Sequence, residues 1–259
     1  MEEIRVAVSG TGKMGRQVAG AVAAADSMRL VGFLDGLATE DTLDGLPLSN
    51  SPADFFGTNP ADVVIDFTNA AWTPGLAQAA LDADCRLVIG TTGLGEEFLS
   101  WLADECEKRE TGAVVAANFA IGAVLMMHFA KQAARFFDSA EIIELHHDQK
   151  VDSPSGTAKT TADLMSAARE EAFSHRASEK EVLPGARGAE TSGIAIHSVR
   201  LPGLVAHQEV LFGGLGQTLS IRHDTTGRDS FMPGVIAAAR AVMDSKGLTV
   251  GLDRLFGLE

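Results

Sequence analysis

A short apolar run followed at once by a glycine-rich turn constrains the fold of this chain more than any other feature. Residues 4–9 (IRVAVS) have the composition of a buried strand, and residues 10–15 (GTGKMG) follow directly. Residues 16–25 then carry apolar side chains at helical spacing, and residues 29–34 form a second apolar run. Asp35 ends this run, 20 residues after the last glycine of the turn. This order is the sequence pattern of a dinucleotide-binding βαβ unit.

Each part of this pattern has a physical task. Gly10 permits the tight turn, Gly12 lets a pyrophosphate approach the backbone, and Gly15 lets the helix pack closely on the strand. The carboxylate of Asp35 accepts hydrogen bonds from a ribose diol. The alternative is a glycine-rich turn without a ligand. We therefore expect a cofactor site made by the turn and the acid: Gly10, Thr11, Gly12, Lys13, Met14, Gly15 and Asp35.

The alternation of strands and helices continues to about residue 119. Apolar runs at residues 62–67, 86–89 and 113–116 alternate with helical patterns at 73–83 and 96–109. This predicts a doubly wound parallel sheet, whose ligands bind at the carboxyl ends of the strands. Small and polar residues follow two of these strands, where plain turn chemistry is the alternative to cofactor contact. These further cofactor candidates are Gly90, Thr91, Thr92, Ala117, Asn118 and Phe119.

The pattern changes near residue 120. Helices are expected at residues 122–136 and 158–170, with a strand at 140–145 between them, and strands then follow one another without intervening helices. These three later strands are expected at residues 194–200, 206–212 and 217–223. A helix is expected at residues 229–244, before an apolar tail.

The predicted fold is therefore α/β, with two domains. Residues 1–119 form a Rossmann-like domain with a doubly wound parallel sheet, completed by the helix and tail at 228–259. Residues 120–227 form a second α/β domain with a mixed, mostly antiparallel sheet.

Composition and charge exclude several classes of protein. The net charge of −14 disfavours nucleic-acid binding, which needs clustered Lys and Arg. Two cysteines without metal-ligand spacing fit a reducing cytoplasm and predict no metal site. The acidic start, which leads into a strand, predicts no signal peptide. Residues 113–130 are apolar, but Asn118 and His128 interrupt them, so we expect a core segment and no membrane association.

Residues 144–158 (ELHHDQKVDSPSGTA) are the best candidate for chemistry. Histidines and a lysine transfer protons near neutral pH, and backbone N–H groups at a helix start bind anions. Together they indicate an enzyme site for an acidic substrate, and the alternative is a surface loop with solvated histidines.

The same stretch resembles the signature of the dihydrodipicolinate reductase family, enzymes of bacterial and plant lysine biosynthesis. The resemblance extends along nearly the whole chain. It includes residues 65–68 (IDFT), 90–93 (GTTG), 117–119 (ANF), 197–200 (HSVR) and 228–232 (RDSFM). The glycine turn departs from the family's usual GxxGxMG, because it is one residue shorter.

The resemblance implies NAD(P)H-dependent reduction of 4-hydroxy-tetrahydrodipicolinate to tetrahydrodipicolinate, in the diaminopimelate and lysine pathway. It also implies a cytoplasmic homotetramer assembled through the second domain. By position, His146 is similar to the acid/base residue and Lys150 to the proton donor, while His147, Gly156 and Thr157 resemble the substrate-binding set. The chemistry of these residues suits a dicarboxylate, but which of the two catalytic candidates donates the proton stays open.

For the cofactor, Asp35 favours NADH, since its carboxylate accepts the 2′-hydroxyl and repels a 2′-phosphate. Lys13 offsets part of that repulsion, so NADPH is expected to be usable as well. Two other functions fit the pattern: another two-domain Rossmann dehydrogenase acting on an amino-acid-derived imine or carbonyl, and a non-catalytic dinucleotide-sensing protein. An acyl-phosphate reductase needs a catalytic cysteine, and neither Cys85 nor Cys106 is expected at the rim of the sheet.

Overall fold

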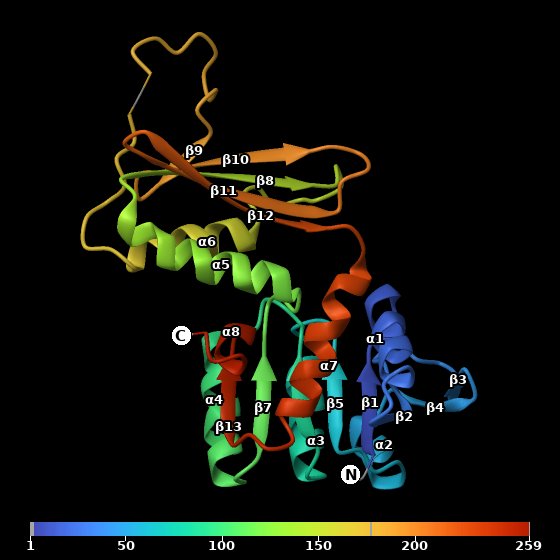
Figure 1. The fold of residues 1–259 in the computed structure, drawn as a ribbon. Coiled ribbons are helices and arrows are strands. Elements are labelled where there is room, and N and C mark those ends of the chain that lie inside the picture. The colour runs from blue at the N-terminus through green and yellow to red at the C-terminus, as the bar shows by residue number, and fades with distance from the viewer. Residues whose placement is uncertain (1–2, 177, 259) are drawn as a thin grey trace. The chain divides into compact units, whose positions relative to one another are not determined.

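The structure, a computed structural model, describes residues 3–176 and 178–258. It divides into two compact units (Figure 1). The first comprises Met1–Ile121 together with Arg228–Glu259, and the second comprises Gly122–Gly227. The expected α/β class is confirmed: one sheet is mostly parallel and the other is mixed.

The first unit is built on an eight-stranded sheet of order β13-β7-β6-β5-β1-β2-β4-β3. Among the described strands of this first sheet, only the β3–β4 pair is antiparallel. The central strands are buried along their length, as expected for a parallel sheet covered on both faces. The strands are β1 (Ile4–Ser9), β2 (Met28–Leu34), β3 (Thr42–Leu43), β4 (Leu46–Ser49), β5 (Val63–Asp66), β6 (Arg86–Ile89), β7 (Gly112–Val115) and β13 (Gly247–Val250). The helices are α1 (Lys13–Ala23), α2 (Pro52–Thr58), α3 (Thr73–Asp82), α4 (Glu96–Lys108), α7 (Met232–Ala241) and α8 (Leu252–Leu255).

The second unit has a five-stranded sheet of order β12-β11-β8-β10-β9. Strands β8 and β10 are parallel and the other pairs are antiparallel. Helices α5 and α6 lie together on one face of this sheet (Figure 1), where buried side chains such as Ile142 and Met165 form the core. The strands are β8 (Ser139–His146), β9 (Ala189–Thr191), β10 (Ile194–Arg200), β11 (Ala206–Gly214) and β12 (Gln217–Thr225). The helices are α5 (Ile121–Ala133), the 3-10 turn η1 (Ala134–Phe136) and α6 (Gly156–Ala167).

Several short elements differ from the sequence prediction. The β3–β4 hairpin turns at Asp44 and Gly45, whose φ angles of 52° and 79° suit the left-handed turn that Asp-Gly favours. The helix expected at residues 229–244 begins with the 3-10 turn η2 (Arg228–Phe231) and continues as α7. Part of the apolar tail forms β13, which pairs with β7 at one edge of the first sheet.

Candidate active site

The glycine turn between β1 and α1 is shaped by close packing. Gly10 has a φ of +105°, and a Cβ there would lie 2.9 Å from the carbonyl oxygen of Phe67. A Cβ on Gly15 would lie 1.8 Å from the carbonyl oxygen of Gly10, so any side chain would displace the turn. Gly12 caps α1 without a side-chain hydrogen bond and has open space where a Cβ would be. The start of α1 is thus accessible to an anion.

Asp35, at the end of β2, is held beside this turn. Its Oδ2 accepts hydrogen bonds from the backbone N–H and the hydroxyl of Thr11 at 2.9 and 2.6 Å, and its Oδ1 accepts from the N–H of Leu37 at 3.0 Å. Burial raises the pKa of Asp35, but the bonds from Thr11 and Leu37 outweigh it, so the pKa is lowered. The carboxylate is therefore ionised at neutral pH.

A cavity of about 470 Å³ opens over the turn and the acid. Its lining includes Gly10, Gly12 and Asp35 from the predicted cofactor set, together with Trp72, which the sequence analysis did not single out. The indole Nε1 of Trp72 donates to Ser9 Oγ at 3.0 Å, and its ring lies where a Cβ of residue 36 would be. The lining of the cavity therefore combines backbone groups, a carboxylate and an aromatic ring.

The remaining predicted cofactor residues follow strands of the same sheet but are not among the residues that line this cavity. Thr91 is buried after β6, and Thr92 and Ala117 are exposed. Gly90 is packed against the ring of Phe67, which a Cβ would approach to 2.1 Å. The Oδ1 of Asn118, after β7, accepts the N–H of Ala120 at 2.9 Å. Lys13 and Met14 begin α1.

A buried carboxylate that the sequence analysis left without a role fixes two of these strand ends. Asp66 has no exposed surface and accepts bonds from the hydroxyls of Thr68, Thr73 and Thr91 at 2.6–2.8 Å. The hydroxyl of Thr91 also accepts the N–H of Thr68 at 2.9 Å. Asp66 therefore joins the ends of β5 and β6 and the start of α3.

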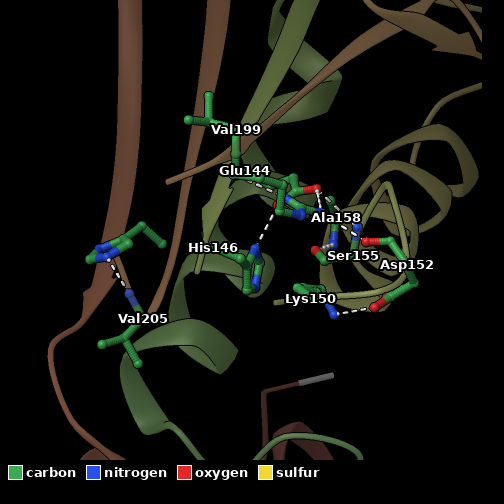
Figure 2. A network of polar contacts seen from close by, with 10 residues as sticks. Glu144, His146, Lys150, Asp152, Ser155, Ala158, Val199 and Val205 are labelled. Atoms are coloured by element: carbon green, nitrogen blue, oxygen red, sulfur yellow. Dashed lines mark hydrogen bonds and ion pairs between the residues drawn. The ribbon is translucent and has the colours of Figure 1, made fainter. Parts of the chain in front are cut away.

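In the second unit, His146 lies at the end of β8 and is bonded to Glu144. The two side chains point to the same face of the sheet, because they are two residues apart on one strand. His146 Nδ1 lies 2.6 Å from Glu144 Oε2 (Figure 2), and the His146 side chain is 14% exposed while that of Glu144 is fully buried. Burial raises the pKa of Glu144, but bonds with His146, Arg200 and Ser198 lower it to about 2.

Arg200 is the functional candidate that the sequence analysis missed. It lies opposite His146 in the β8–β10 register, and its two Nη atoms donate to both oxygens of Glu144 at 2.7 and 2.8 Å. Its Nη2 also donates to the carbonyl of Asp152 at 2.9 Å. The motif at residues 197–200 contained the residue, but nothing in the sequence indicated that it pairs with Glu144.

The loop from β8 to α6 carries the other predicted substrate-site residues. Lys150 Nζ lies 2.6 Å from Asp152 Oδ1 (Figure 2), and His147 is exposed. Gly156 and Thr157 open α6, whose N-cap Ser155 accepts the N–H of Ala158 at 3.2 Å. The loop thus connects the His146 strand end to the start of α6 within one unit.

The other histidines and the cysteines have different surroundings. His197 and His207 lie 2.8 and 2.7 Å from carboxylates of Glu141 and Asp224 on neighbouring strands. Both cysteines are unpaired and buried, and burial raises the pKa of the Cys106 thiol to about 11. Within residues 3–176 and 178–258, no three His, Cys, Asp or Glu residues are grouped to hold a metal ion. No helix in that part of the chain is long and apolar enough to cross a bilayer.

Comparison with known proteins gives matches over both units. The model of the dihydrodipicolinate reductase N-terminus matches residues 4–119, and that of the C-terminus matches residues 122–256. The 4-hydroxy-tetrahydrodipicolinate reductase of Moorella thermoacetica is 47% identical over 261 residues, covering 97% of each chain. The enzyme of that name from Cutibacterium acnes is 48% identical, covering 99% of this chain and 100% of the relative.

Solved structures agree with these matches. A dipicolinate-bound dihydrodipicolinate reductase from Paenisporosarcina sp. TG-14 superposes with a TM-score of 0.90 at 43% identity, covering 97% of this chain and 99% of the other. An amine dehydrogenase from Mycobacterium smegmatis shares the fold alone, with a TM-score of 0.69 at 14% identity, covering 98% of this chain and 96% of the other. The resemblance drawn from the sequence motifs is confirmed: this chain belongs to the dihydrodipicolinate reductase family of oxidoreductases.

Proposed function

We propose that this chain reduces 4-hydroxy-tetrahydrodipicolinate to tetrahydrodipicolinate, in the pathway to diaminopimelate and lysine. The net reaction adds a hydride and a proton to the substrate and releases water. The observation that carries the proposal is the Glu144–His146 pair at the end of β8, directly before the loop that bears Lys150, in a chain 47–48% identical to two reductases of this name. The family depends on a pyridine nucleotide, which supplies the hydride when bound.

The first unit has the groups that such a nucleotide requires. The open start of α1 at Gly12 suits a pyrophosphate. Asp35 has about four acceptor positions and uses three for Thr11 and Leu37, which leaves about one for a ribose hydroxyl. Because this carboxylate is ionised, it disfavours a 2′-phosphate, so NADH is the preferred cofactor and NADPH is usable.

The second unit supplies the groups that bind the substrate carboxylate and the group that donates the proton. The N–H groups of Gly156 and Thr157 at the start of α6 bind a substrate carboxylate, assisted by the positive charge of Lys150 and by His147, both on the loop before this helix. As hydride reaches the ring, negative charge grows toward the ring nitrogen, and a proton from His146 or Lys150 neutralises it. A positioned proton donor contributes about 10²–10⁴-fold to such a step.

The uncovered face of the second sheet supports assembly into a homotetramer. Helices cover one face of this sheet, whereas Ile143, Leu145, Val199 and Leu211 lie half-buried on the other. Burying this face against other copies would remove apolar side chains from water. Sedimentation of the purified protein tests this: a monomer mass at assay concentration contradicts it. The unpaired, buried cysteines fit a reducing cytoplasm.

The function is tested by following NADH oxidation with the freshly made condensation product of pyruvate and aspartate semialdehyde. Turnover that requires both pyruvate and the semialdehyde is expected. Activity on pyruvate alone, or on an amino-acid-derived imine in place of this product, would favour a different two-domain dehydrogenase. NADH binding without any turnover would favour a dinucleotide-sensing protein.

A further inference from the structure

The carboxylate of Glu144 is enclosed by hydrogen-bond donors. It has no exposed surface. It accepts hydrogen bonds from both Nη groups of Arg200, and one from the backbone N–H of Ser155 at 3.2 Å. The pKa of Glu144 is lowered to about 2, so the group is ionised at neutral pH and accepts hydrogen bonds without donating any.

This ionised carboxylate decides which nitrogen of His146 carries a hydrogen. Nδ1 lies 2.6 Å from Glu144 Oε2, a distance that requires a donor on one of the two atoms. Since Glu144 has no proton to give, Nδ1 must hold it. The Nε2 atom is then the nitrogen of His146 left to exchange a proton with a substrate.

We propose that Glu144 is a positioning residue of the reductase reaction, which fixes the ring of His146 with hydrogen on Nδ1 and assigns proton exchange to Nε2. This inference rests on the proposed function, in which His146 takes part in proton transfer. Glu144 touches neither the substrate nor the cofactor in this scheme and acts through the histidine. A carboxylate that orients an imidazole in this way recurs in unrelated enzymes.

The same carboxylate also aligns the two other parts of the site. Through Ser155, it fixes the cap of α6, whose first N–H groups bind the substrate carboxylate in the proposed scheme. Through Arg200, which bonds the carbonyl of Asp152, it holds the loop that carries Lys150. The buried carboxylate of Glu144 therefore helps to fix the position of the His146 ring, of the Lys150 loop and of the start of α6.

A second carboxylate on the same strand provides a matched control. Glu141 Oε2 lies 2.8 Å from Nε2 of His197, and its Oε1 accepts a bond from Arg187. This is the same set of carboxylate, imidazole and guanidinium, but three residues away on the opposite face of β8. Glu141→Gln therefore removes a similarly paired but less buried charge, on the opposite face of the strand from His146.

The first test measures the tautomer in the unmodified full-length protein. With ¹⁵N-labelled histidine, and with His146→Gln to assign the signals, the neutral His146 ring should carry its hydrogen on Nδ1. A predominant Nε2–H tautomer in the wild type overturns the proposal, whatever the variants do. In Glu144→Gln the side-chain amide can also donate a hydrogen bond to Nδ1, so the fraction of the Nδ1–H tautomer should fall. An unchanged tautomer ratio in this variant contradicts the assigned role of Glu144.

The second test uses kinetics in a double-mutant cycle. Glu144→Gln should lower kcat about 10-fold or more, within the contribution of one proton-transfer residue, and leave the Kd of NADH unchanged. In the His146→Gln background the same change should lower kcat by a clearly smaller factor, because the part of its effect that acts through the histidine is gone and only its hold on the loop and the helix start remains. Glu141→Gln should keep kcat within about twofold of the wild type.

The outcomes separate this inference from the proposed function. A wild type without turnover contradicts the proposed function itself. A fully active His146→Gln contradicts the role of the histidine. If His146→Gln is impaired and Glu144→Gln is fully active, the inference is wrong. It is also wrong if the double variant loses the full product of the two single-variant factors in kcat, because Glu144 then does not act through His146. Thermal unfolding of each variant identifies a loss of kcat that comes from unfolded protein.

Discussion

Both Nη atoms of Arg200 meet both oxygens of Glu144, at 2.7 and 2.8 Å, and the carboxylate has no exposed surface. Arg200→Met would leave this charge buried without its cation. We expect a loss of about 3 kcal/mol in the free energy of unfolding, at the lower end for a broken buried pair, because Arg200 is partly exposed. Urea denaturation measures this. Arg16→Met, which breaks the exposed pair with Asp44, should change stability by less than about 0.5 kcal/mol.

Glu144 also makes the protein sensitive to acid. Its folded-state pKa of about 2 lies below the ordinary value of 4.5, so between these values the unfolded chain binds the proton more readily. The stability it contributes is fully present above pH 4.5 and is lost as the pH falls toward about 2. Urea midpoints measured from about pH 6 to about pH 3 should fall less steeply for Glu144→Gln than for the wild type. Equal slopes would contradict this assignment.

Lys150→Met should lower kcat by about 10²-fold or more, because it removes the cation that binds the substrate carboxylate and is a candidate proton donor in the proposed scheme. NADH affinity, measured by fluorescence titration, should not change, since the nucleotide groups identified above belong to the first unit. Lys159→Met is the control, because this exposed lysine pairs with Asp163 of the same helix α6. Equal loss of turnover and of NADH binding would mean that Lys150 has a structural role.

Two glycines of α1 should respond in opposite directions to alanine. Gly15→Ala places a Cβ within 1.8 Å of the Gly10 carbonyl and should cost about 1–3 kcal/mol of stability, together with nucleotide affinity. Gly20→Ala has open space around the new Cβ and should stabilise the helix by about 0.5–1 kcal/mol. Thermal unfolding and NADH titration of both variants would check this. Similar effects at the two positions would contradict the close packing of the turn.

Asp35→Ser should shift the cofactor preference toward NADPH. Removing the ionised carboxylate removes its repulsion of a 2′-phosphate, and a change of about 1.4 kcal/mol corresponds to a tenfold ratio. We expect the NADPH/NADH ratio of kcat/KM to rise about tenfold, measured by steady-state rates with each cofactor. A wild type that already prefers NADPH would show that this carboxylate does not control the choice.

The elements that carry a clear local pattern could be predicted from the sequence. The strand at Arg86–Ile89 and the strand at Ile194–Arg200 have the predicted bounds, since apolar runs with clear ends specify them. β3 has only two residues, and the four of β13 (GLTV) lack the unbroken apolar run that marks the equally short Arg86–Ile89 (RLVI). They form because neighbouring strands offer unpaired backbone groups, which is a property of the assembled sheet.

The sequence offered candidate residue types for the site, but it did not show which of these residues bond to one another. His146 and Lys150 stood out because their side chains transfer protons near neutral pH. Glu144 and Asp66 did not stand out, since a carboxylate within an apolar run gives no sign of the donors that will surround it. Those donors come from distant segments: Arg200 is 56 residues from Glu144, and Thr91 is 25 residues from Asp66.

The division of the chain has a consequence for synthesis on the ribosome. The second unit is continuous, from Gly122 to Gly227, whereas the first is made of two segments that flank it. Strand β7 pairs on one side with the edge strand β13, which comes from Gly247–Val250. A growing chain therefore presents the complete second unit while the first sheet still has an open edge at β7. The nucleotide-binding sheet, although it begins the chain, is the last of the two to be finished.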